Sequence, residues 1–267
     1  MKKYGPELDD GDSRKGRVAL VTGGAKRMGR EILLRLAAEG YVCVVHYHHS
    51  ESEAEQTRRD CLSAGAPRAY TLACDLADSD ARRSLIARAL DQTGGLDLLV
   101  NNASLFEYDT ADTFRTDLFA SHLQTNYLAP VELTMSLHAA LPMVERTRAH
   151  VITLLDQKLF NLNADYMSYT LAKLASHSSI RYLAQCCAPK LRVNAIAPGV
   201  TLPSTDMDET GFARAHRIAA TGKSSTAQDI AQAVWLLESS PAITGQTLAV
   251  DGGQHLVPRA RDVAFGD

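Results

Sequence analysis

Tyr169 and Lys173 are four residues apart, a spacing that places a phenol and an ammonium group on the same face of a helix. A free phenol has a pKa of about 10, and an ammonium about 4 Å away contributes on the order of 4 kcal/mol at an effective dielectric near 20. That energy equals roughly 3 pK units, so we expect Lys173 to lower the pKa of Tyr169 and make it an acid near neutral pH. Because the chain has nine tyrosines, the spacing alone could arise by chance, and its context must decide.

Asp156 precedes Tyr169 by thirteen residues and permits two interpretations. A carboxyl group beside the phenol can relay a proton to a ring nitrogen, a task for which a serine hydroxyl is less suited. The alternative is a loop carboxylate that caps the turn before Asn161. Only the first interpretation makes Asp156 catalytic.

A glycine-containing turn occupies residues 22–29, TGGAKRMG, between a predicted strand and a predicted helix. Its amides and the helix N-terminus can face a pyrophosphate. The turn lacks the G-x-G-x-x-G spacing, so a purely structural turn is the alternative. Lys26 and Arg27 favour nucleotide binding, because two cations beside the turn suit an additional phosphate.

Residues 46–50, HYHHS, end the second predicted strand and bear on the choice of cofactor. Dehydrogenases that prefer NAD usually place an acid at this position to bind the ribose diol, whereas NADP requires that acid to be absent. The first acid here is Glu51. With Arg27, this pattern predicts NADPH, although the histidines could simply be a solvated strand end.

Seven predicted strands alternate with helices, which indicates an α/β fold with one doubly wound, Rossmann-type parallel sheet. The strands are expected near 18–22, 41–47, 69–73, 96–100, 150–155, 191–197 and 247–251. The helices are expected near 28–39, 50–64, 78–93, 114–144, 166–188 and 226–239. We expect a single domain over 17–256, a disordered extension over 1–16 and a tail over 257–267. Because polar or glycine-containing loops follow six of the strands, the chemistry should gather at their carboxyl ends.

The composition is that of an ordinary globular protein, with 267 residues, 45% of them hydrophobic and 22% charged. A net charge of −3 gives no reason to expect nucleic acid or an anionic membrane as partner. No apolar run approaches the roughly 20 residues that a bilayer span requires. Five cysteines without C-x-x-C spacing predict reduced thiols, no metal site and a cytoplasmic protein.

An ordered set of motifs between about Arg17 and Leu256 resembles the short-chain dehydrogenase/reductase family. The set comprises Thr22, Gly23, Gly29, Asp75, Asn101, Asn102, Ala103, Asn126, Tyr169, Lys173, Pro198, Gly199, Asp251, Gly252 and Gly253. The chain is most similar to the pteridine reductase branch, because most family members have serine at Asp156 and a third glycine at Arg27. In pteridine reductases those two positions are aspartate and arginine.

The resemblance implies a role for each matching residue. The implied catalytic residues are Tyr169, Lys173, Asp156 and Asn126, with Lys173 bound to the nicotinamide ribose and Asn126 to backbone and a water. The implied NADPH ligands are Gly23, Lys26, Arg27, Met28, Gly29, His48, His49, Ser50, Asp75, Leu76, Asn102, Ala103, Ser104, Tyr169, Lys173, Pro198 and Gly199. The implied substrate ligands are Arg27, Ser104, Phe106, Asp156 and Tyr169.

Phe106 could be a platform for a planar substrate or an ordinary core residue. Residues 200–222 lie where the family carries a mobile substrate lid. The family is commonly tetrameric, which predicts a homotetramer, and the tail could reach a neighbouring subunit or stay disordered.

The sequence thus predicts a reductase that transfers hydride from NADPH to a small molecule of the dihydropterin type. One alternative is a reductase of the same family that acts on a ketone or a 3-oxoacyl thioester. A more distant alternative is a non-catalytic NADP-binding sensor, a class that normally loses the tyrosine or the lysine.

Overall fold

The computed structural model describes residues 16–142, 149–203 and 209–265. Seven parallel strands form one sheet in the order β3-β2-β1-β4-β5-β6-β7. This arrangement confirms the predicted doubly wound α/β fold. The predicted disorder of the N-terminal extension falls almost entirely on residues 1–15, which lie outside the described residues.

Runs of apolar and β-branched residues build the strands, and most of their side chains are buried because helices cover both faces of the sheet. The strands are β1 (Val18–Val21), β2 (Val42–Tyr47), β3 (Ala69–Ala73), β4 (Leu98–Asn101), β5 (Ala149–Leu154), β6 (Leu191–Pro198) and β7 (Thr247–Val250). All seven fall within two residues of the predicted positions.

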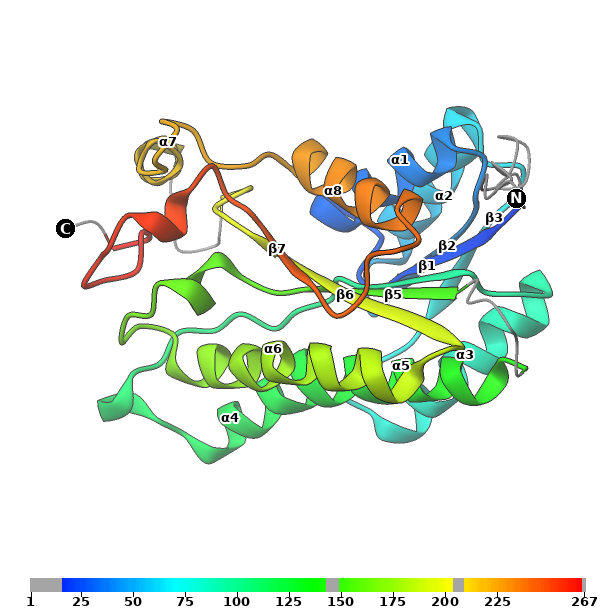
Figure 1. Ribbon diagram of the computed structural model, residues 1–267, viewed down its shortest axis with the longest axis horizontal. Helices are drawn as coiled ribbons and strands as arrows, with labels where there is room; N and C mark the ends of the chain where they lie inside the picture. The colour runs from blue at the N-terminus through cyan, green and yellow to red at the C-terminus, as the bar shows by residue number, and fades with distance from the viewer. Residues whose placement is uncertain (1–15, 143–148, 204–208, 266–267) are drawn as a thin grey trace, which may run out of the picture.

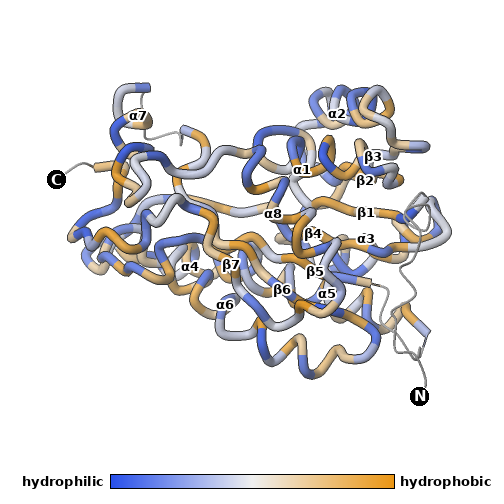
Figure 2. Tube along the Cα trace, turned by 45° about the horizontal axis from the view of Figure 1, so that its top comes forward, coloured by the Kyte–Doolittle hydropathy of each residue, from blue (hydrophilic) through white to orange (hydrophobic). Residues whose placement is uncertain are grey.

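The helices lie in two layers (Figure 1). One face of the sheet carries α1 (Arg27–Ala38), α2 (Glu51–Ala64) and α8 (Ala227–Ser239). The other carries α3 (Ser79–Thr93), α4 (Thr116–Leu123), α5 (Ala129–Ala140) and α6 (Met167–Cys187). Each layer seals one apolar cluster against the strands. Figure 2 shows the same division, with hydrophobic strands inside and the hydrophilic α2 outside.

Two helical regions show detail that the sequence did not predict. The helical material expected over 114–144 runs without a break from Thr116 to Ala140, as α4, a π-helical segment, Gln124–Leu128, and α5. Pro130, near the start of α5, lacks the N–H that would continue the helical hydrogen bonds where the π-helical segment ends. Residues 200–222, expected to be a mobile lid, contain an additional helix, α7 (Glu209–Arg217). The rest of that expectation falls partly on residues 204–208, which are not described.

The C-terminal segment after the 3₁₀ helix Gln254–Leu256 packs against its own chain. Figure 1 shows it beside α7. The Asp165 carboxylate accepts hydrogen bonds from the Asp262 amide at 2.7 Å and from Arg261 Nε at 2.9 Å. Over the described residues the segment is therefore placed against its own chain, and the expected contact with a neighbouring subunit stays a prediction.

No helix in the described part of the chain is long and apolar enough to cross a membrane. All five cysteines are free thiols, and only Cys186 is exposed.

Candidate active site

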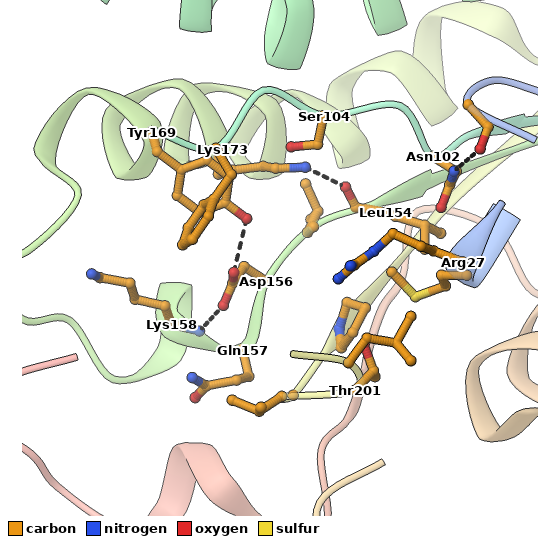
Figure 3. Close-up of a pocket in the computed structure, with 18 of the residues that line it drawn as sticks. Arg27, Asn102, Ser104, Leu154, Asp156, Gln157, Lys158, Tyr169, Lys173 and Thr201 are labelled. Carbon is orange, nitrogen blue, oxygen red and sulfur yellow. Dashed lines mark hydrogen bonds between the residues drawn. The ribbon is translucent and has the colours of Figure 1, made fainter. Parts of the chain in front are cut away.

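A cavity of about 490 Å³ opens at the carboxyl ends of the strands, and Figure 3 shows its wall. The loops after β1, β4, β5 and β6 line it, as the sequence predicted for strand-end loops. The C-terminal segment completes the wall with three residues. The main lining residues are Gly23, Lys26, Arg27, Met28, Gly29, Asn102, Ala103, Ser104, Phe106, Asp156, Tyr169, Lys173, Pro198 and Gly199.

The glycine turn after β1 is fixed by close backbone packing. A Cβ atom at Gly29 would lie 2.3 Å from the carbonyl oxygen of Gly23, so only glycine allows the helix to approach the turn. Asn102 Nδ2 donates to the carbonyl oxygen of Thr22 at 2.8 Å, and Thr22 Oγ1 accepts from the backbone amides of Asn102 and Ala103. The ends of β1 and β4 are thus joined at the point where the strand order reverses.

Arg27 is the first residue of α1 and has a φ of +55°. This left-handed conformation favours glycine, which accounts for the third glycine of the general family pattern at this position. The Arg27 guanidinium lines the cavity and donates to the carbonyl oxygen of Pro203 at 2.7 Å. The neighbouring Lys26 ammonium is exposed and lies 3.7 Å from Glu53.

Tyr169 and Asp156 form a hydrogen-bonded pair at the centre of the cavity wall (Figure 3). The phenol donates to Asp156 Oδ2 at 2.8 Å, while Asp156 Oδ1 accepts from the backbone amide of Lys158 at 2.8 Å. Asp156 therefore caps the 3₁₀ helix Gln157–Phe160 and also contacts Tyr169, which combines the two interpretations that the sequence left open. Burial raises the pKa of Asp156.

Lys173 lies one helical turn after Tyr169, and its ammonium donates to the carbonyl oxygen of Leu154 at 2.7 Å. Burial lowers the pKa of Lys173 to about 8. The expected lowering of the Tyr169 pKa by Lys173 is wrong for this structure. Burial and the adjacent Asp156 carboxylate hold the pKa of Tyr169 well above its ordinary value. The Lys173 ammonium lies 5.7 Å from the centroid of the Tyr169 ring and is bonded elsewhere.

Phe106 lies on the loop after β4 and lines the cavity. Its ring stacks on Tyr166 at 4.2 Å between centroids and meets the edge of Tyr169 at 4.7 Å. The side chain nevertheless stays 37% exposed, so the interpretation of Phe106 as a core residue is wrong. Tyr166, which directly precedes α6, is fully buried and supports the ring from behind.

Asn126 lies in the π-helical segment and holds the loop after β4. Its side-chain oxygen accepts from Ser104 Oγ at 3.1 Å and from the Leu105 amide at 2.9 Å, and its Nδ2 donates to the Leu105 carbonyl oxygen. The expected backbone contact of Asn126 is therefore confirmed. Its expected water, which would link Lys173 to solvent, stays a prediction.

The remaining predicted cofactor residues lie outside the cavity. His48, His49 and Asp75 form an exposed group. The centroids of the two imidazole rings lie 3.4 Å apart with the rings tilted by 31°, and His48 Nε2 lies 3.7 Å from Asp75. Ser50 precedes α2, and Leu76 is buried. These residues follow β2 and β3, the two strands on the α2 side of the glycine turn.

His46 has a role that the sequence did not reveal. Its buried ring accepts from the Gly23 amide at 3.0 Å through Nδ1, which leaves the Nε2 proton to donate to the Cys74 carbonyl oxygen, also at 3.0 Å. Burial lowers the pKa of His46 to about 4, so the imidazole is neutral at physiological pH. The neutral ring of His46 thus holds the glycine turn through its hydrogen bond with the Gly23 amide.

Several lining residues were not predicted from the sequence: Leu154, Leu155, Gln157, Lys158, Val200, Thr201, Leu202, Asp262, Val263 and Ala264. Position after a strand was a usable signal for those that follow β5 and β6. Residues 262–264 carried no such signal, because contacts with residues far earlier in the chain, such as that of Asp262 with Asp165, hold them at the cavity.

The chain matches known reductases over most of its length. Residues 23–255 match the family model described as Enoyl-(Acyl carrier protein) reductase. Pteridine reductase 1 of Leishmania tarentolae is 30% identical over 90% of this chain and 96% of its own length. The 3-oxoacyl-[acyl-carrier-protein] reductase FabG of Staphylococcus aureus is also 30% identical, over 89% of this chain and 98% of its own.

Solved structures give the same result. FolM Alternative dihydrofolate reductase 1 from Brucella canis, complexed with NADP, superposes with a TM-score of 0.83. It is 35% identical, and the match covers 90% of this chain and 94% of that one. The ordered motifs, the doubly wound sheet and these similarities agree. The chain is an oxidoreductase that belongs to the short-chain dehydrogenase/reductase family.

Proposed function

We propose that the protein is an NADPH-dependent reductase of pteridines of the dihydropterin type. The observation that carries this proposal is the partly buried hydrogen bond between the Tyr169 phenol and the Asp156 carboxylate in the cavity wall. Reduction of a pteridine adds hydride to a carbon and a proton to the adjacent ring nitrogen, so a titratable pair beside the substrate suits the reaction. A pteridine reductase and the FolM alternative dihydrofolate reductase are among the relatives, which supports the same choice.

The residues around the glycine turn fit NADPH as the cofactor. Lys26 and Arg27 supply positive charge beside the turn, and the end of β2 carries histidines in place of an acid. We propose that Gly23, Met28, Gly29, Asn102, Ala103, Pro198 and Gly199 hold the cofactor, and that His48, His49 and Ser50 bind its additional phosphate. We expect NADPH to bind at least tenfold more tightly than NADH, about 1.4 kcal/mol. Equal affinities in a fluorescence titration would contradict this assignment.

Bound NADPH supplies the hydride, and the side chains of this chain manage the proton. Burial raises the pKa of both Asp156 and Tyr169. The Tyr169 phenol therefore keeps its proton, and Asp156 lies at hydrogen-bond distance from it, where the two groups can exchange a proton. Lys173 lies within the same buried region and can offset the negative charge that remains after donation. The exposed ring of Phe106 offers a planar surface on which a pteridine can stack.

A substrate comparison tests the proposal. The enzyme is supplied with NADPH and, in parallel, with a dihydropterin, a small ketone and a 3-oxoacyl thioester, and NADPH consumption is followed. We expect turnover with the dihydropterin. The proposal would be refuted if the enzyme consumed NADPH with the ketone or the thioester and consumed none with dihydropterins.

Reduction of a ketone or a 3-oxoacyl thioester is the second candidate. It is favoured by the similarity to FabG and by the description of the family model. A carbonyl substrate needs a donor only at its oxygen, which Tyr169 supplies without Asp156. The dependence of turnover on Asp156 therefore separates the two candidates.

We also propose that the protein is a homotetramer. The outer surfaces of α5 and α6 expose the large apolar side chains of Met135, Leu171 and Tyr182, the last of them 68% exposed. Helix surfaces of this kind are typical of subunit contacts. Sedimentation of the purified chain tests this, and a monomer at micromolar concentration would contradict it.

A further inference from the structure

The C-terminal segment 257–265 forms part of the cavity wall of its own chain and is held there by several contacts. The Asp165 carboxylate binds Arg261 Nε at 2.9 Å and the Asp262 amide at 2.7 Å. The Val263 side chain is 8% exposed, and the Phe265 ring lies 4.9 Å from that of Tyr108. These contacts give the segment a defined position, so its side chains can take part in recognition.

Two hydrogen-bond acceptors on this wall have no part in the proposed proton transfer. Gln157 lines the cavity, and its Oε1 atom is buried with no hydrogen-bond partner among the described residues. A buried carbonyl oxygen without a partner is unfavourable, so a donor group placed beside it would be stabilised. The Asp262 carboxylate lines the same cavity, with Oδ2 3.4 Å from Lys158 Nζ.

The two acceptors, Gln157 Oε1 and the Asp262 carboxylate, lie further from the glycine turn than the Tyr169–Asp156 pair does. In Figure 3, Arg27 and Asn102 lie to the right of Asp156, whereas Lys158 lies to its left and Gln157 below it. The contact between Asp262 and Lys158 places the tail carboxylate on the same side as Lys158. A substrate whose reacting atoms face Asp156 therefore directs its far substituent toward Gln157 and Asp262.

The charges around these residues favour donors over anions. Lys158 Nζ is shared between the Asp165 carbonyl oxygen and the Asp262 carboxylate, and Arg261 is paired with the Asp165 carboxylate. Because both cations are already bonded to oxygens of the protein, an incoming carboxylate would meet mainly acceptors. A hydroxyl or amino group would meet partners that complement it.

We propose that Gln157 and Asp262 form a substituent subsite that accepts hydrogen bonds from hydroxyl or amino groups on the substrate. The C-terminal segment supplies half of this subsite within the same chain. The inference rests on the proposed function, because the substituent is taken to be the side chain carried by a dihydropterin. It adds a specificity role for two residues that take no part in the chemical step.

The test compares two dihydropterins with the same ring, one with a hydroxyalkyl substituent and one with a methyl group. The measured quantity is the ratio of their kcat/KM values with saturating NADPH. We expect the wild-type enzyme to prefer the hydroxyalkyl substrate, and Gln157→Met and Asp262→Asn each to reduce the ratio about tenfold. Asp112→Asn, an exposed carboxylate on another 3₁₀ helix, is the matched control and should keep the ratio.

The outcomes separate the subsite from the proposed function. If Gln157→Met and Asp262→Asn both turn over the two dihydropterins with the wild-type ratio of kcat/KM values, the subsite is refuted. The proposed function is unaffected by that result. A wild-type enzyme that consumes NADPH with neither dihydropterin would refute the proposed function and this inference with it. NADPH titration of each variant establishes that it is folded before the ratio is measured.

Discussion

Replacement of Asp156 by serine restores the residue that most members of the family carry and removes the carboxylate that accepts the Tyr169 proton at 2.8 Å. The serine hydroxyl can still bond the phenol, but it cannot hold a mobile proton at neutral pH. Loss of a general acid–base group typically reduces the rate by about 10²–10⁴-fold, which corresponds to roughly 3–5 kcal/mol. We expect a loss of this size in kcat for a dihydropterin, and little change for any carbonyl substrate that the enzyme accepts.

The assay follows NADPH consumption at saturating cofactor for wild type, Asp156→Ser and Asp112→Ser, the last as an exposed control. Unfolding should not explain the loss, because burial raises the pKa of Asp156 and the ionised carboxylate therefore opposes folding. The native state then binds more protons than the unfolded state, so wild-type stability falls as pH rises above the ordinary carboxyl pKa of about 4. In the Asp156→Ser variant this contribution to the pH dependence of the free energy of unfolding should be absent. A kcat of the Asp156→Ser variant for the dihydropterin within about fivefold of wild type would refute the proton-relay role of Asp156.

Three further changes test other parts of the site. Tyr169→Phe should abolish turnover while NADPH binding persists, since only the hydroxyl is lost; unchanged rates would remove Tyr169 from the mechanism. The Kd for NADPH should increase as the pH rises through about 8, because the lowered pKa of Lys173 makes its ammonium lose a proton there; a Kd that stays constant across this range would contradict the assignment of Lys173 to the cofactor. Gly29→Ala should weaken NADPH binding by tenfold or more, since the added methyl would lie 2.3 Å from the Gly23 carbonyl oxygen. The control is Gly95→Ala, because a Cβ added there meets nothing within 4 Å. Titration of that variant with NADPH should give the wild-type affinity.

Patterns over short stretches of sequence predicted the structural features that are set by residues close together in the chain. The turn between β1 and α1, the strand positions and the helical spacing of Tyr169 and Lys173 all follow from short-range periodicity. The gathering of loops at one edge follows from the topology of a parallel sheet. These two kinds of information were sufficient for the fold and for the central residues of the cavity.

Burial and distant contacts were not accessible in the same way. The pKa of Tyr169 was predicted with the wrong sign because a sequence does not show that the phenol is buried against Asp156. The role of His46 depends on a contact with Gly23, and the place of Asp262 depends on Asp165, far earlier in the chain. Neither contact leaves a periodic signal in the residues around it.

The C-terminal wall of the cavity separates the two sides of the site along the chain. The glycine turn and the strands β1 to β4 lie within the first 101 residues, and the proposed cofactor residues end at Gly199. Asp262, Val263 and Ala264 line the cavity from a segment that contains none of those residues. Removal of residues 257–265 would therefore open one wall of the substrate side and leave every proposed cofactor residue in the chain.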